Sequence, residues 1–541
     1  MLNSNFESWD YWVFGLYALV IIVMGLWVSR SKKGEQKTAE DYFLAGKSLP
    51  WWAIGASLIA ANISAEQFIG MSGSGFAIGM AIASYEFMAA LTLIIVGKFF
   101  LPVFIKQGLY TIPEFVERRF SKNLKTILAV FWIALFVFVN LTSVLFLGAK
   151  AIDTIIGTGN GDLFIPSIIG LAFVAAAYSI YGGLSAVAWT DVVQVILLVV
   201  GGVITTLIAL AHVSPDGGIV SGLMHVTDVA GDKFHMIINK DNPQFNNLPG
   251  IAVLIGGLWV ANLYYWGFNQ YIIQRTLAAK SLREAQHGII FAAFLKLIVP
   301  LIVVIPGIVA FVMYKESNDP AVISMFEATG GADKAYPWLI SSFIPTGLKG
   351  LVLAALAAAI VSSLASMLNS TSTIFTMDIY KSYIEPKASS RKLVNVGRLT
   401  AAIALIIAGF LAPLMASFDQ MFQYIQEYTG LVSPGILAVF MMGLFWKKTT
   451  NKGAIVGVLI SIPVALLLKF LPIDMPFLDQ MMYTFFITIA TIAMVSLSTN
   501  TADDDAKALS LTSSMFTTDK VFNICAYIIC ILLAVIYVFM W

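Results

Sequence analysis

Two hydrophobic segments, residues 50–76 and 248–275, open the two halves of this chain, and polar residues interrupt each of them. The first is interrupted near Asn62 and the second near Asn262. Inside a bilayer, every backbone group freed from a helix needs another partner, so a broken helix is tolerated only in a protein interior or beside a watery cavity. A pair of broken segments at corresponding positions of two halves is typical of the binding site of a secondary transporter.

Composition places the chain in the membrane. Of its 541 residues, 59% are hydrophobic and only 12% are charged, a balance that excludes a soluble globular protein. The formal net charge of +1 gives no electrostatic footprint for nucleic acid. We therefore predict an all-α polytopic membrane protein whose partners are the lipid bilayer and a small solute, with no nucleic-acid partner.

Motifs for enzymatic chemistry and cofactor binding are missing from the sequence. It has two cysteines, Cys525 and Cys530, both in the last apolar run, and its four histidines are scattered. This pattern excludes a disulfide framework and a Cys/His metal cluster. There is no zinc-protease motif, nucleophile elbow or complete phosphate-binding loop. We predict that the protein is not an enzyme and has no cofactor. Met1–Asp10 lacks the basic region of a cleavable signal, so the first apolar run is expected to remain as a membrane helix.

Apolar runs of about 20 residues mark the expected crossings. We predict fourteen, which places both termini on the same side. They lie near residues 9–29, 50–74, 77–104, 127–149, 163–181, 184–212, 249–273, 287–314, 347–380, 397–416, 420–446, 453–471, 477–497 and 520–540.

The distribution of lysine and arginine predicts which side that is, because cytoplasmic loops carry the excess. The loops on one side, including 30–47 and 381–398, hold 23 of these residues, and the loops on the other side hold seven. Lys98 and Lys296 fall within spans. Both termini are thus expected outside a cell membrane, the inner membrane if the source is bacterial.

Counting the crossings also predicts a repeat. The second to sixth and the seventh to eleventh segments form two sets of five, and an odd number gives the sets opposite orientations. We expect one integral domain with four parts: a peripheral first helix and basic loop (1–48), a first repeat with an external loop (49–247), an inverted second repeat (248–446) and three peripheral helices (447–541).

Ionisable residues inside spans are functional candidates because a charge at the bilayer centre costs about 2.5–3.5 kcal/mol. Five such residues stand out, and for four of them a structural role is an alternative to a functional one. Asp191 could reach the interface, Glu86 and Lys296 could form a structural ion pair, and Glu66 could satisfy a broken helix end. The five are Glu66, Glu86, Asp191, Lys296 and Glu427.

Amides, carboxylates and aromatic rings in the interrupted segments suit a neutral polyol. A sugar offers many hydroxyls and one apolar face, so polar groups are needed at its rim and a ring beneath it. Asn262, Tyr265, Trp266 and Asn269 have the spacing of one helical face. The alternative is that Tyr and Trp only pack or form an interfacial belt. The set is Asn62, Gln67, Tyr85, Glu86, Asn262, Tyr265, Trp266, Lys296 and Gln426.

Small and hydroxylated residues recur along 354–372, including Ser362 and Ser363. Such stripes usually serve close helix packing. The alternative is a sodium site, because sodium is satisfied by oxygen ligands, and the carbonyls of a broken helix near 60–63 together with serine hydroxyls supply them.

Several motifs together resemble the sodium:solute symporters, and within that family the bacterial sodium/galactose symporters, over nearly the whole chain. The resemblance implies a leucine-transporter-type five-plus-five inverted repeat, with one helix before the core and three after it. The motifs are Asp41-Tyr-Phe-Leu-Ala-Gly-Lys-Ser48, Ala60-Ala-Asn-Ile-Ser-Ala-Glu-Gln-Phe68, Tyr181-Gly-Gly-Leu-Ser-Ala186 with Trp189-Thr-Asp191, Trp259 to Arg275, and Gln423-Tyr-Ile-Gln-Glu-Tyr-Thr429.

The resemblance also implies roles for individual residues. Sugar contacts would be Gln67, Glu86, Asn262, Lys296 and Gln426, with Asn62 nearby. Tyr265, beside Trp266, would stack on the sugar as an inner gate, and Met71, Tyr85 and Phe422 would form an outer gate. Sodium would be held by the carbonyls of Ala60, Ile63 and Ala359 and the hydroxyls of Ser362 and Ser363, with Asp191 on its exit path.

The expected function is sodium-coupled import of a hexose, such as galactose or glucose, by alternating access. One position departs from the pattern, because Ala89 stands where a sugar-contacting serine is expected, and this leaves the preferred hexose open. The alternatives are a symporter of the same fold for an amino or organic acid, coupled to sodium or protons, and a sodium-modulated sensor or channel. The sequence predicts neither the sodium-to-sugar ratio nor the oligomeric state.

Overall fold

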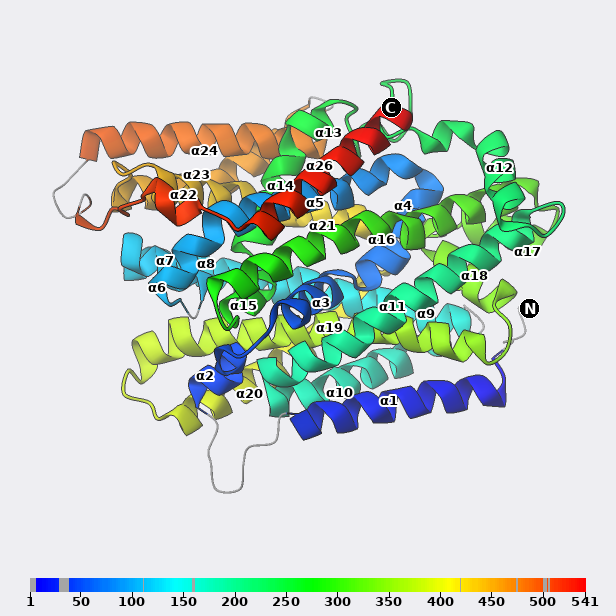
Figure 1. The fold of residues 1–541 in the computed structure, drawn as a ribbon, viewed down its shortest axis with the longest axis horizontal. Coiled ribbons are helices and arrows are strands. Elements are labelled where there is room, and N and C mark those ends of the chain that lie inside the picture. The colour runs from blue at the N-terminus through cyan, green and yellow to red at the C-terminus, as the bar shows by residue number, and fades with distance from the viewer. Residues whose placement is uncertain are drawn as a thin grey trace.

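The computed structural model describes residues 6–28, 38–109, 111–157, 161–418, 420–472, 475–499, 504 and 506–541, and these are almost entirely helical. Within the described ranges, the only extended pairing recorded is an isolated bridge between Leu49 and Ala279. The long helices run roughly along one direction, with α1 and α10 at one edge and α23 and α24 at the other (Figure 1). This confirms the all-α prediction.

The first half of the chain runs up to the loop that holds α12. Its α-helices are α1 (Ser8–Val28), α2 (Ala39–Leu44), α3 (Trp51–Asn62), α4 (Ser72–Ala77), α5 (Ser84–Ile95), α6 (Leu101–Gln107), α7 (Ile112–Arg119), α8 (Lys122–Ala134), α9 (Thr142–Ile155), α10 (Phe164–Gly182), α11 (Leu184–Val213) and α12 (Ile219–Val229). Shorter helical turns link several of these, among them the π-helical segment η2 (Glu66–Met71).

The second half begins with another interrupted segment. Its α-helices are α13 (Ala252–Ile255), α14 (Gly257–Phe268), α15 (Gln270–Leu277), α16 (Leu282–Glu316), α17 (Pro320–Glu327), α18 (Ala335–Phe343), α19 (Leu348–Ile374), α20 (Ser390–Leu411), α21 (Met421–Gly430), α22 (Ser433–Phe445), α23 (Asn451–Phe470), α24 (Phe477–Thr499) and α26 (Lys520–Phe539). A π-helical extension, η8 (Phe375–Ile384), follows α19 directly.

The first predicted break is confirmed, and side chains stabilise it. Ile63 leaves the helix with φ −77° and ψ 99°, and the chain becomes helical again in η2. The Ser64 N–H donates to Oε1 of Gln67 at 3.0 Å, and the Glu66 N–H donates to the Ser64 hydroxyl oxygen at 3.0 Å. These bonds satisfy N–H groups that an interrupted helix leaves over.

The second break lies elsewhere than predicted. Asn262 is inside α14, and the chain is extended at Asn269, with φ −80° and ψ 122°, between α14 and α15. A further interruption at Gly256 separates α13 from α14. The prediction of a kink at Asn262 was therefore wrong by two turns, because a polar residue in an apolar run marks a site without marking where the backbone leaves the helix.

The fourteen predicted spans each coincide with helical structure, but fewer qualify as single helices long and apolar enough to cross a membrane. In the described part of the chain there are ten of these, or eleven if the bent pair α21 and α22 is one span. The segments around α3 and α14 are interrupted, and the apolar part of α10, Phe164–Ala177, is short. The structure thus gives a multi-pass protein with about ten or eleven candidate crossings, of which the eleventh is a bent pair of helices.

Both ends of the described chain touch loops that were assigned to the same side. Near the N-terminus, Oδ1 of Asp10 accepts hydrogen bonds from the N–H groups of Gly347 and Gly350, at 2.7 and 2.8 Å. At the C-terminus, the Met540 carbonyl accepts a bond from the Met236 N–H at 2.6 Å. Gly347 and Gly350 stand at the start of α19, directly after the predicted loop 315–346, and Met236 lies in the loop 213–247, so Asp10 and Met540 both lie next to loops that were assigned to one side.

Some cations assigned to loops are in fact buried. Arg275 is fully buried, and Arg119 is 1% exposed and donates to the carbonyls of Gly443, Lys447, Thr449 and Asp504. The count of loop charges therefore included residues that stabilise the interior, since a guanidinium group offers five donors in a fixed fork.

Candidate functional site

A cavity with an empty volume of about 540 Å³ lies between η2, α5, α14, α16 and α21. We call it the central cavity; its 540 Å³ includes space open to solvent, and the enclosed part that a water molecule can occupy is about 50 Å³, below the roughly 300–1,000 Å³ typical of small-molecule sites. All eleven residues predicted as sugar contacts or gates line it. They are Asn62, Gln67, Met71, Tyr85, Glu86, Asn262, Tyr265, Trp266, Lys296, Phe422 and Gln426.

The polar centre of this cavity is an ion pair between Lys296 of α16 and Glu86 of α5. The Lys296 ammonium group also donates to Oδ1 of Asn62, and it lies 5.0 Å from the centre of the Trp266 ring. Lys296 is fully buried and Glu86 is 3% exposed. The reading of these two residues as an ion pair is confirmed, and the pair faces the cavity instead of lying behind it.

Tyr265 links both interrupted segments. Its hydroxyl oxygen accepts a hydrogen bond from Nδ2 of Asn62 at 2.9 Å and another from the Tyr271 hydroxyl at 2.6 Å. The rings of Tyr265 and Tyr271 meet edge to face, 5.7 Å apart. Residues 203 positions apart in the sequence are thereby held at one wall of the cavity.

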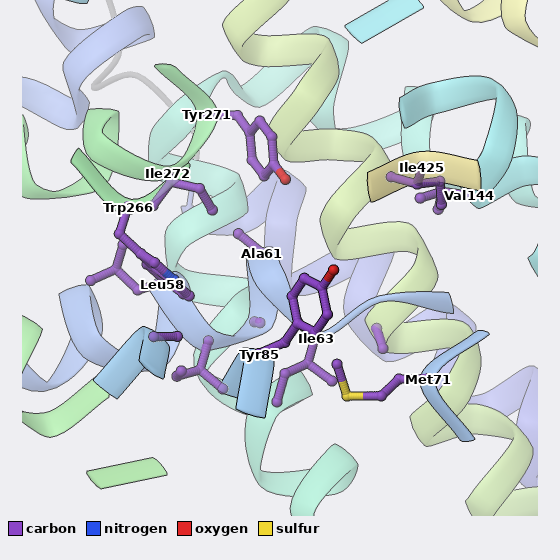
Figure 2. Packing of buried hydrophobic residues seen from close by; sticks show 14 of the residues in the cluster. Leu58, Ala61, Ile63, Met71, Tyr85, Val144, Trp266, Tyr271, Ile272 and Ile425 are labelled. Atoms are coloured by element: carbon purple, nitrogen blue, oxygen red, sulfur yellow. The ribbon is translucent and has the colours of Figure 1, made fainter. Parts of the chain in front are cut away.

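Another wall is apolar. Tyr85 and Phe422 meet edge to face with their ring centres 5.1 Å apart, and Met71 is fully buried. In Figure 2, Tyr85 and Met71 project toward the region where α3 ends at Ile63. The three residues predicted as an outer gate thus line the same cavity, while their role as a gate remains a prediction.

The remaining candidates differ in their partners. Gln67 uses its Oε1 to accept from Ser64, and Asn262 donates to the Leu258 carbonyl at 3.1 Å. Glu66 lines the cavity, and its Oε1 is buried without a hydrogen-bond partner. Ala89 also lines the cavity, so the position that departs from the expected pattern does face the site.

Two candidates lie elsewhere. Asn269 is not among the described cavity residues, because the backbone leaves the helix there and the predicted face of four residues ends at Trp266. Glu427 pairs with Lys469 at 3.0 Å beside a separate small cavity. Its side chain is 38% exposed, so it is no buried charge.

The break after α3 frees the carbonyls that were predicted to bind sodium. In an unbroken helix, the N–H groups of Ser64 and Gln67 would serve Ala60 and Ile63. Here the Ser64 N–H donates to the Gln67 side chain, and the Gln67 N–H donates to the Ser64 carbonyl at 3.2 Å. The Ser363 hydroxyl of α19 donates to the carbonyl of Ala61 at 3.0 Å, which brings the serine-rich helix to this break.

Asp191 lies next to these serines and is fully buried, so the alternative in which it reaches the membrane interface was wrong. Its carboxylate accepts from the hydroxyls of Ser57 and Ser362, and it faces Nη2 of Arg275 at 3.4 Å. Arg275 also donates to the hydroxyl of Ser366 and, through Nε, to the Ser57 carbonyl at 3.0 Å. All of these side chains are buried, with at most 1% exposed.

Sequence reasoning missed Arg275, Ser57 and Tyr271 as parts of this region. Arg275 was assigned to a loop because it follows the apolar run, although a buried carboxylate at Asp191 called for a cation. No group of three or more His, Cys, Asp or Glu side chains suited to a metal occurs in the described residues. A cation at this place would therefore depend on carbonyl and hydroxyl oxygens, which hard cations accept.

Comparison with known proteins agrees with this geometry. Residues 42–461 match the model of the sodium:solute symporter family. The chain is 65% identical to the sodium/glucose cotransporter of Vibrio parahaemolyticus, over 98% of both chains. It is 33% identical to the human sodium/myo-inositol cotransporter 2, covering 92% of this chain and 77% of that protein.

Solved structures show the same architecture. A Na⁺-coupled sialic acid symporter, solved in a substrate-bound outward-open state, matches with a TM-score of 0.79 and 25% identity over 92% of this chain and 99% of that one. Mhp1, a nucleobase-cation-symport-1 family transporter, matches in fold alone, with a TM-score of 0.50 and 15% identity over 86% of this chain and 97% of that one. The motifs, the cavity between broken helices and these matches together show that the chain belongs to the sodium:solute symporter family.

Proposed function

We propose that this protein imports a hexose together with sodium by alternating access, with the central cavity as the sugar site. The observation that carries the proposal is that Lys296, Glu86, Asn62 and Tyr265, from four different helices, converge on one cavity beside aromatic rings. Hydroxyl groups of a sugar can exchange hydrogen bonds with these side chains, and Trp266 and Tyr265 offer flat apolar faces. The relatives named as sodium/glucose cotransporters support this choice of solute.

Sodium is proposed to bind where α3 ends, as a transported ligand. Its ligands would be the carbonyls of Ala60, Ile63 and Ala359 and the hydroxyls of Ser362 and Ser363. The redirected N–H groups of Ser64 and Gln67 support this assignment. Asp191 would guide the departing ion, since its carboxylate shares Ser362 with the site.

Coupling follows if sodium stabilises the end of α3, because Asn62, the last residue of that helix, contacts both Lys296 and Tyr265 in the central cavity. An ion that orders this end also positions the sugar ligands, which is linkage between two binding events. Tyr265 would close the inner side, and Met71, Tyr85 and Phe422 would close the outer side.

The energy available is sufficient for one ion per sugar. One sodium ion entering through 100 mV contributes about 2.3 kcal/mol, and a tenfold concentration gradient adds about 1.4 kcal/mol. The sum of roughly 3.7 kcal/mol supports a sugar gradient of about 500-fold.

The finer topology is also proposed. The interrupted segments count as crossings, giving fourteen, with 49–247 and 248–446 as two inverted five-helix repeats between the peripheral parts 1–48 and 447–541. The contacts of Asp10 with the start of α19, directly after the loop 315–346, and of Met540 with the loop 213–247 support a common side, which the lysine and arginine distribution makes external. The family and the Vibrio relative support a cell membrane location.

A symporter for an organic or amino acid is disfavoured because Lys296, the one cation among the described lining residues of the central cavity, is already paired with Glu86. The decisive experiment is uptake by the purified protein in liposomes, with a panel of labelled hexoses under an inward gradient of either sodium or protons. We expect hexose accumulation only with sodium, and loss of accumulation in Gln67→Ala. Uptake that follows the proton gradient, or that amino acids inhibit and hexoses do not, would refute the proposal.

A further inference from the structure

A second cavity, with an empty volume of about 830 Å³, lies among α1, α9, α10, α11 and α19. We call it the lateral cavity. It is bounded by Phe14, Tyr17 and Ile21 of α1, which share one helical face, and by Ala358 and Val361 of α19. In Figure 1, α1 and α10 form an outer edge of the bundle.

Three side chains with polar atoms line this cavity, Tyr17, Ser167 and Gln194, and Gln194 is the one that carries an amide. Gln194 of α11 lines it and is fully buried, and both Nε2 and Oε1 lack a hydrogen-bond partner in the described structure. A buried amide without partners costs about 1–3 kcal/mol for each unsatisfied group. Gln194 therefore lowers the stability of the folded protein unless a molecule in the cavity bonds to its amide.

The chemical character of the lining residues restricts which molecules can occupy the lateral cavity. None of the described lining residues carries a charge, and most are aliphatic or aromatic. A phosphate or ammonium head would lose its hydration without compensation, and a sugar would leave most of its hydroxyls unpaired. Water could bond to the Gln194 amide, but most of the remaining wall is aliphatic or aromatic, and apolar cavities stay dry.

We propose that the lateral cavity binds a membrane-dissolved molecule with a long apolar body and one uncharged hydroxyl head, which donates to Oε1 of Gln194 and accepts from Nε2. The source of the occupant is the bilayer, since helices α1 and α10 expose large apolar side chains such as Leu16, Ile169 and Phe173. Gln194 is one helical turn from Asp191 on α11, and Val361 precedes Ser362 on α19, so an occupant would contact the helices that hold the ion-binding region.

Two glycines provide a matched pair of variants. Gly170 lines the lateral cavity, and a Cβ atom built there meets nothing within 4 Å. A phenylalanine at this position therefore fills open space. Gly15 of α1 also has nothing within 4 Å of a built Cβ and is exposed, as Gly170 is, but it lies outside the cavity lining.

The test uses the full-length protein in lipid nanodiscs, a photoreactive long-chain alcohol, and an alkane probe of the same length without the hydroxyl. Labelled residues are mapped by mass spectrometry. We expect saturable labelling of the α1 and α19 walls by the alcohol, displaced by 1-dodecanol at concentrations where dodecane does not compete. Gln194→Leu should lower the affinity for the alcohol probe about tenfold, which corresponds to the loss of about 1.4 kcal/mol of hydrogen bonding. The affinity for the alkane probe should not change.

Gly170→Phe should abolish labelling by both probes, and Gly15→Phe should leave both unchanged. Equal affinity of the wild-type protein for alcohol and alkane would overturn the proposal without any variant, because the head group would then be irrelevant. Labelling that does not saturate, or that persists in Gly170→Phe, would show only partition into lipid and would also overturn it. None of these outcomes depends on which solute the protein transports.

Discussion

Lys296 and Glu86 form a buried ion pair whose charged groups face a cavity instead of packed side chains. Desolvating two charges costs several kcal/mol per ion, and their attraction repays this only with good geometry and further hydrogen bonds. The contact from Lys296 to Oδ1 of Asn62 supplies one such bond. An arrangement this costly for stability alone points to a role in binding solute hydroxyls.

Breaking the pair should separate its structural role from its functional one. Glu86→Leu or Lys296→Met leaves one buried charge without a partner, and we expect a loss of about 3–5 kcal/mol in stability. The double variant removes both charges and should unfold near the wild-type temperature, while hexose uptake stays absent. Thermal unfolding of purified protein and uptake in liposomes measure the two effects. A double variant that transports normally would show that the pair does not bind the sugar.

The Tyr265 hydroxyl and ring are expected to contribute differently. Tyr265→Phe removes the hydrogen bonds with Asn62 and Tyr271, worth about 1 kcal/mol each, and keeps the ring. The KM for hexose should rise less than tenfold in this variant, and further in Tyr265→Ala, which removes the apolar face as well. Tyr336→Phe, a buried tyrosine outside the central cavity, is the control. Equal KM values for the phenylalanine and alanine variants would argue against stacking of the sugar on this ring.

Sodium binding should depend on the hydroxyl of Ser363, which already reaches the carbonyl of Ala61. Ser363→Ala should raise the sodium concentration for half-maximal uptake by about five- to tenfold, the effect of about 1–1.4 kcal/mol. Thr371→Val on the same helix removes a hydroxyl that bonds within its own helix, to Met367, and should change little. Sodium activation curves at saturating hexose provide the measurement, and equal shifts in the two variants would remove Ser363 from the ion site.

Ala89 gives a prediction about specificity. It lines the central cavity and offers no hydrogen bond. Ala89→Ser adds a hydroxyl beside Glu86, so affinity for one hexose epimer should increase relative to another by about three- to tenfold. Competition by galactose and glucose against a single labelled hexose gives the ratio in both proteins. An unchanged ratio would place this side chain outside the sugar's reach.

The sequence predicted those features that depend on composition and on local pattern. The apolar runs mark where helices lie, and the polar residues between Asn62 and Gln67 mark the first break, since few polar groups are tolerated in a membrane helix without a purpose. Nine of the eleven cavity residues were proposed from their polar or aromatic side chains, and Met71 and Phe422 were added only by the resemblance to a family pattern. Their convergence on one cavity depends on how distant helices pack, which no local pattern specifies.

The predictions that failed, for the second helix break and for Arg275, also concern features that depend on how distant helices pack. The second break lies at Asn269, because a backbone kink depends on tertiary partners for the freed groups, and Gly267 nearby does not by itself mark a break. Arg275 follows an apolar run and reads as a loop residue, although it is buried against Asp191, 84 positions earlier in the chain. Pairing across that distance is visible only once the helices are packed.

The most direct test of the account is equilibrium binding of hexose and sodium to the purified protein, each measured with and without the other. If the end of α3 joins both sites, sodium should raise hexose affinity, and hexose should raise sodium affinity by the same factor, as linkage requires. Asn62→Ala should reduce this factor toward one while the protein remains folded. Hexose affinity that is independent of sodium, or a coupling factor unchanged in Asn62→Ala, would contradict the account.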